Sequence, residues 1–174
     1  MSPMMPDAPR KVAPVSVVIP CYRCAATIDR AVASVLAQSL PVAEIILVDD
    51  ASGDDTLEIL TGIRERCGSK LIRIVEARTN CGPGEARNLG WAEASQPWIA
   101  FLDADDAWHP EKIEIQYQWL LDHPDVVVCA HQTIVAPSPE WPLPAKITAR
   151  WIDPARLPYS NIIPTRSVIV RRDV

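Results

Sequence analysis

The chain has 174 residues, of which 48% are hydrophobic and 22% are charged, and its formal net charge is -5. This composition is ordinary for a soluble globular protein with one core, and the negative charge argues against nucleic acid as the main partner. Residues 1–14 lack the apolar core of a signal peptide and no apolar run is long enough to cross a bilayer, so we expect a disordered N-terminal tail, no membrane span and a cytoplasmic protein.

The first two predicted elements are a strand at residues 15–20 and a helix that begins after Thr27. The strand, VSVVIP, is short and β-branched, which is typical of a buried parallel strand. Thr27 can cap the helix, and the spacing of the apolar residues that follow predicts one buried face. That face comprises Ile28, Val32, Val35 and Leu36.

Strand-like and helix-like patterns continue to alternate as far as residue 131. Further strands are expected within residues 44–50, 70–77, 97–102 and 125–130, and further helices within residues 52–68, 80–95 and 110–124. This alternation predicts an α/β domain over residues 15–131, in which helices cover both faces of a mostly parallel, Rossmann-like sheet. Residues 132–174 are rich in proline and show little periodicity before a strand-like end, which indicates a long loop or a crossing to another lobe.

Acidic side chains follow two of the predicted strands. The segment FLDADD ends in Asp103, Asp105 and Asp106, and a second strand ends in Asp49 and Asp50. Clustered carboxylates repel one another unless a cation or hydrogen-bond donors compensate. Ligands of open parallel sheets bind beyond the carboxyl ends of the strands, and ligation by oxygen alone favours Mg or Mn over zinc. In an extended segment, Asp103 and Asp105 would share one side, with Asp106 at a cap or toward solvent.

Two of the five cysteines form a C-x-x-C motif, Cys21 and Cys24, just after the first predicted strand. Thioredoxin-like proteins place a redox pair there, but Pro20 stands where their tryptophan would be. A zinc site would need a second pair of ligands, and the other three cysteines are scattered singly. We therefore expect free thiols that form neither a zinc site nor a functional redox pair.

Two further loop residues have more than one interpretation. Tyr22 follows the first strand, so it can belong to the core or can stack on a base. Arg87 would lie near a helix start, where a cation is mildly unfavourable, which indicates that it faces an anion or a carboxylate. Acids such as Asp54 and Asp55, by contrast, are favourable at a helix start without any ligand.

Taken in order, the motifs VSVVIPCYRCAAT, EIILVDDASGDDT, NCGPGEARNLG and WIAFLDADD resemble family-2 glycosyltransferases of the GT-A fold, from Val15 to about Val128. The resemblance implies a site for a nucleoside-diphosphate-sugar donor. In it, Pro20 and Tyr22 would line the first loop, and Asp50 or Asp49 would pair with the base. The remaining matches are Arg87 near the base and phosphates, Asp103 near the ribose or sugar, and Asp105 as the ligand of Mg or Mn.

The implied activity is metal-dependent, inverting transfer of the sugar to an unknown sugar, lipid or polysaccharide acceptor. The chain departs from the family at Arg23, where asparagine is common. The family's catalytic base lies in an acidic motif on a later segment, and the only acid after Ser167 is Asp173, which does not match that motif. We therefore expect the donor half and the beginning of the acceptor half, truncated on the C-terminal side. A catalytically incomplete nucleotide-binding or scaffold module is the alternative. A nucleotidyltransferase would usually carry a glycine-rich basic loop, which PCYRCAAT does not provide.

Overall fold

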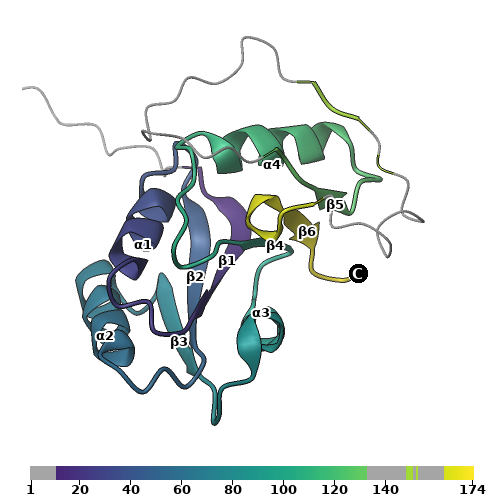
Figure 1. Cartoon of the computed structure of the whole chain (residues 1–174). Helices are drawn as coiled ribbons and strands as arrows, with labels where there is room; N and C mark the ends of the chain where they lie inside the picture. Colours follow the sequence, from purple (N-terminus) through teal and green to yellow (C-terminus); the bar gives the residue numbers. More distant parts are fainter. Residues whose placement is uncertain (1–10, 133–147, 151, 153–162) are drawn as a thin grey trace, which may run out of the picture.

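In the computed structural model, a six-stranded sheet forms the centre of the described part of the chain, residues 11–132, 148–150, 152 and 163–174 (Figure 1). The strand order is β3-β2-β1-β4-β6-β5. The strands are β1 Ala13–Cys21, β2 Val42–Asp49, β3 Ile72–Glu76, β4 Trp98–Phe101, β5 Val128–Cys129 and β6 Ile169–Arg171. The first four are parallel, whereas β6 pairs antiparallel with both β4 and β5. The mostly parallel sheet is therefore confirmed, and β1 begins slightly earlier than the sequence pattern indicated.

Helices cover both faces of this sheet, as predicted. They are α1 Ile28–Leu36, α2 Thr56–Cys67, α3 Gly82–Glu93 and α4 Lys112–Asp122, with a short 3₁₀ turn, η2, at Thr165–Ser167. Alternate residues of β1 enter two separate cores, because side chains of a strand point to opposite faces. Val17 and Ile19 belong to the core formed with α1, α2 and α4, whereas Val18 belongs to the other core with Ala86 of α3. Within the described residues, no helix combines the length and apolarity that a membrane span requires.

One residue of the predicted α1 face is not buried. Leu36 is 46% exposed, and Ala31 is buried instead, beside Ile28, Val32 and Val35. At 3.6 residues per turn, Leu36 lies at the margin of the apolar stripe, while Ala31 lies nearer to its centre. The prediction for Leu36 was therefore wrong, and the buried face is shifted by one row of side chains.

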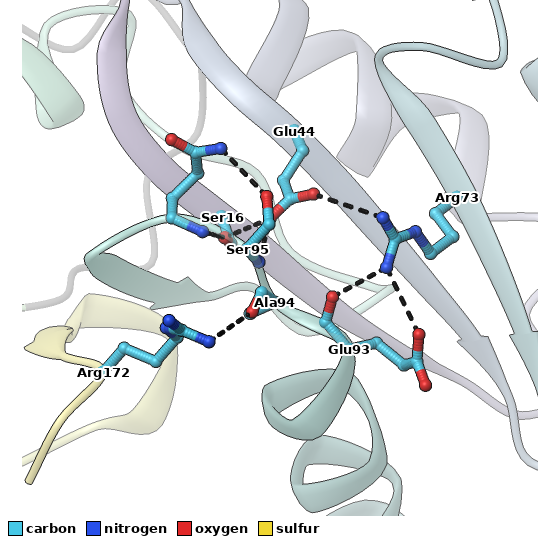
Figure 2. Close-up of polar contacts among 8 residues, drawn as sticks. Ser16, Glu44, Arg73, Glu93, Ala94, Ser95 and Arg172 are labelled. Carbon is cyan, nitrogen blue, oxygen red and sulfur yellow. Dashed lines mark hydrogen bonds and ion pairs between the residues drawn. The ribbon is translucent and has the colours of Figure 1, made fainter.

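A buried carboxylate ties together the amino ends of β1, β2 and β4, away from the carboxyl ends that carry the candidate site. Glu44 Oε1 accepts hydrogen bonds from the Ser16 hydroxyl and from the Ser95 amide (2.6 Å) and hydroxyl (2.9 Å), and Arg73 lies 4.0 Å from the other oxygen (Figure 2). Burial raises the pKa of Glu44, but the hydrogen bonds and the arginine outweigh it and leave the pKa below its usual value. The junction between α3 and β4 is thereby fixed.

Gly90 allows α3 to approach the sheet closely. A Cβ atom at this position would lie 2.3 Å from Val18 Cγ1 and 3.1 Å from Val48 Cγ2, both buried. We expect Gly90→Ala to lower the free energy of unfolding by about 1–3 kcal/mol, the usual cost of overpacking a core. Urea denaturation measures this loss. Gly84→Ala is the matched control in the same helix, because its Cβ would meet nothing within 4 Å. Equal stability of the two variants would contradict the close packing.

Candidate functional site

Asp50, at the carboxyl end of β2, binds the start of α3. Its carboxylate accepts hydrogen bonds from the amides of Cys81 and Gly82, both at 2.8 Å, and from the Cys81 thiol at 3.0 Å. The residue is only 2% exposed. Burial raises the pKa of Asp50, but the thiol and the two amides outweigh burial, so the pKa lies below its usual value. An ionised carboxylate therefore sits at the N-terminus of α3, where backbone amides and the helix dipole favour negative charge.

A second set of contacts joins the loops that follow β1 and β2. Buried Asp49 accepts a hydrogen bond from the Ser52 hydroxyl, whose oxygen accepts one from the Arg23 amide at 3.1 Å. Arg23 Nε also donates to the Ser52 carbonyl at 3.3 Å, and the guanidinium carbon lies 5.4 Å from the ring centroid of Tyr22, which is 46% exposed. Arg23 and Ala51 adopt positive φ angles of 50° and 53°. Such angles are uncommon outside glycine and concentrate at functional loops.

The acidic segment after β4 turns instead of continuing as an extended chain. The Asp106 amide donates to the Asp103 carbonyl at 3.0 Å, and the strand ends at Phe101. Strict alternation of the three side chains therefore does not apply. Asp105 is exposed, whereas Asp103 and Asp106 are half-buried. The expectation that Asp106 caps or faces solvent was wrong, because the turn directs its carboxylate to Arg166, 3.1 Å away.

Arginines from three different elements compensate the negative charge of this turn. Arg87 Nη2 in α3 lies 2.5 Å from Asp103 Oδ1, and Arg166 in η2 pairs with Asp106. Arg30 in α1 donates to the backbone carbonyl of Asp105. Within the described residues, the Asp105 carboxylate has no hydrogen bond or ion pair of its own. The carboxylate that remains free is therefore the one at the most exposed position of the turn.

Several predicted site residues are brought together by these contacts. Asp50 fixes the start of α3, and the second turn of the same helix carries Arg87, which faces a carboxylate as predicted. Tyr22 and Asp49 belong to the neighbouring network through Arg23 and Ser52. Pro20 lies in β1 opposite Val48. A single pocket shared by Tyr22, Asp50 and Arg87 stays a prediction.

Sequence reasoning missed four partners of the site. They are Arg30, Ser52, the Cys81 amide and thiol, and Arg166. Ser52 and Cys81 lie in loops that the sequence analysis had assigned to the site, so their closeness in sequence to the predicted site residues could have identified them. Arg166 follows the Pro-rich segment, and no local pattern connects it to the acidic turn.

The cysteine pair is buried beside this site. All five cysteines are free thiols, and the described residues contain no group of three or more His, Cys, Asp or Glu side chains arranged to hold a metal. The hydrogen bond with Cys24 and burial raise the pKa of Cys21 well above its usual value, whereas the hydrogen bond with Cys21 lowers the pKa of Cys24. Cys21 is therefore a poor nucleophile and a poor zinc ligand, because the thiolate is the reactive form.

Comparison with known proteins decides the family. A family model described as glycosyl transferase family 2 matches residues 16–168. The chain belongs to this family. One curated relative is an uncharacterized glycosyltransferase of Nostoc sp. It is 42% identical to this family 2 chain, over 58% of this chain and 30% of its own length.

Two solved structures resemble this family 2 chain and confirm the GT-A fold. TarS of S. aureus in complex with UDP has a TM-score of 0.57 and 30% identity, over 63% of this chain and 32% of that one. The mannosyltransferase PcManGT of Pyrobaculum calidifontis, in complex with GDP-Man and Mn²⁺, has a TM-score of 0.61 and 26% identity, over 70% of this chain and 38% of that one. The chain thus spans about a third of the length of each of these three proteins.

Proposed function

We propose that this family 2 chain binds a nucleoside-diphosphate sugar and carries mainly the donor site. The reaction is a metal-dependent, inverting transfer of the sugar to a sugar, lipid or polysaccharide acceptor. The carboxyl ends of β1, β2 and β4 would hold the donor, as expected for ligands of parallel sheets. The complexes of TarS with UDP and of PcManGT with GDP-Man and Mn²⁺ support this class of donor.

The observation that carries the proposal is the incomplete hydrogen bonding of the Arg87 guanidinium. Its Nη2 pairs with Asp103, while its Nε is buried and has no hydrogen-bond partner within the described residues. A buried donor without an acceptor costs about 1–3 kcal/mol, so it indicates a ligand that supplies one. A phosphate or ribose oxygen would satisfy Arg87 Nε while Asp103 faces the ribose or sugar.

The side chains of the acidic turn fit a hard divalent cation. They offer carboxylate oxygens and no sulfur or imidazole, which suits Mg or Mn. Asp105 would bind the ion directly, because it has no competing partner among the described residues. When bound, the ion would neutralise the leaving diphosphate as a Lewis acid. One or two carboxylates hold such ions weakly until substrate phosphates complete the ligand set.

Asp49 and Asp50, at the end of β2, differ in whether their carboxylate oxygens are free to accept a hydrogen bond from the nucleotide base. Both oxygens of Asp50 already accept hydrogen bonds from the start of α3. Oδ2 of Asp49 has only a 3.5 Å contact with the Ser52 amide. This difference favours Asp49 as the acid that pairs with the base, with Tyr22 stacked against the ring and Asp50 holding α3 in place.

Metal binding in the presence and absence of nucleotide tests the proposal. Adding UDP or GDP should raise the affinity of the chain for Mn²⁺ roughly 5- to 150-fold, the usual range of coupling between two ligands. Asp105→Ala should abolish this rise, while Asp106→Ala, its matched control at the next position of the same turn, should largely preserve it. Calorimetry or paramagnetic relaxation measures both. Equal loss in the two variants, or absence of coupling in the natural chain, would refute the assignment.

A further inference from the structure

Arg166 is attached to the acidic turn at two points. Its Nη1 lies 3.1 Å from Asp106 Oδ2, and its backbone carbonyl accepts a hydrogen bond of 2.9 Å from the indole Nε1 of Trp108. Arg166 lies in η2, beyond the Pro-rich segment, whereas Asp106 and Trp108 follow β4. The second attachment uses the main chain, so it fixes the position of Arg166 independently of its side chain.

The charge of Asp106 depends on this one arginine. Oδ2 of Asp106 is buried and accepts no well-directed hydrogen bond within the described residues, so the ion pair with Arg166 is its compensation. Without Arg166, the turn would hold a second uncompensated carboxylate beside Asp105.

We propose that Arg166 is a positioning residue that keeps Asp106 away from the divalent ion, so that Asp105 and the donor diphosphate hold the ion together. The inference rests on the proposed function. Cation affinity rises with the number of charged oxygen ligands. If two carboxylates of the turn were free, the ion would bind without nucleotide, and binding of the two would no longer be coupled. Pairing with Arg166 leaves one free carboxylate, too few to hold Mg or Mn alone.

The test is the affinity of the 174-residue chain for Mn²⁺, measured by electron paramagnetic resonance without nucleotide and with UDP or GDP. Arg166→Gln should bind Mn²⁺ alone roughly ten-fold more tightly, the order expected when a unit charge near the ion is removed. The further gain from nucleotide should shrink. Arg166→Lys should stay close to the natural chain, because it keeps the charge. Arg166→Gln combined with Asp106→Asn should restore the natural affinity.

Arg171→Gln is the matched control, because it removes the same charge from β6, where Arg171 pairs with Asp173 at 2.6 Å. It should leave both affinities unchanged. Asp106→Asn alone supplies a second measurement if Arg166→Gln does not fold: it leaves the Arg166 charge uncompensated and should weaken binding of Mn²⁺ alone.

Two outcomes would overturn the inference while the proposed function stands. One is unchanged or weaker binding of Mn²⁺ alone by a folded Arg166→Gln variant, and the other is tighter binding by Asp106→Asn. Absence of nucleotide coupling in the natural chain would instead overturn the proposed function itself.

Discussion

Replacing Lys112 by methionine should raise the free energy of unfolding at pH 7 by about 2–4 kcal/mol. Lys112 is 6% exposed, and its ammonium has no hydrogen-bond partner within the described residues. Burial lowers its pKa from 10.5 to about 7, which corresponds to at most about 5 kcal/mol of stability. The Trp108 ring, 3.8 Å from Nζ, favours the charged form and returns part of this cost. Methionine fills a similar volume without a charge.

The gain in stability from Lys112→Met should become smaller as the pH rises. Between pH 7 and 10.5, the unfolded chain binds a proton at Lys112 that the folded chain has largely lost, so the stability of the natural chain rises with pH across this window. Below it, both states are charged and the full cost of burial applies. The advantage of Lys112→Met should therefore be greatest at pH 7 or below and disappear near pH 10.5.

Urea denaturation of both proteins at several pH values measures this difference. Lys70→Met, at an exposed position, is the control and should change stability little at any pH. A gain that does not vary with pH would show that better packing, and not the buried charge, accounts for the effect. A loss of stability would show that the ammonium is compensated.

Replacing Asp50 by alanine should cost about 3–5 kcal/mol of stability, because hydrogen bonds to a charged group contribute about 1.5–3 kcal/mol each. The change leaves the Cys81 and Gly82 amides at the start of α3 without their acceptor. The same variant should weaken nucleotide binding, since α3 carries Arg87. Denaturation with urea and calorimetry with UDP or GDP measure the two effects.

The contribution of Asp50, like that of Lys112, makes the natural chain more stable as the pH rises, but it does so in the acidic range. Its folded pKa lies below the ordinary 3.8, so the contribution is present above pH 3.8 and is lost as the pH falls through the folded pKa. Asp54→Ala is the control: Asp54 also accepts a hydrogen bond at a helix start, from the Thr56 amide, but it is exposed and should cost less. Equal losses in both variants would contradict the role of burial.

The order of strands and helices could be predicted from the sequence, because apolar periodicity reports directly on local structure. The same pattern predicted that Asp50 and Asp103 would follow the carboxyl ends of two parallel strands, and in the sheet β1 lies between these two strands. Their partners were harder to predict. Arg87 was expected to face a carboxylate, since a cation near a helix start needs one, and it does.

Contacts between distant segments could not be predicted. Asp106 and Arg166 are separated by sixty positions and by the Pro-rich segment, and neither has a pattern that specifies the other. The turn at Asp103 depends on one backbone hydrogen bond, which replaced the expected alternation. The position of β6 between β4 and β5 likewise depends on long-range pairing, which local periodicity does not encode.

That strand order has a consequence for how the protein forms. The four parallel strands can assemble from consecutive strand–helix–strand units. Among the strands that the structure describes, however, β5 pairs only with β6, which is synthesised much later. Until Ile169–Arg171 arrive, β4 presents a row of unpaired amides and carbonyls along its free edge, the kind of surface on which chains associate. Completion of the sheet is therefore a late, high-contact-order step, and slow folding and aggregation of intermediates should originate at β4.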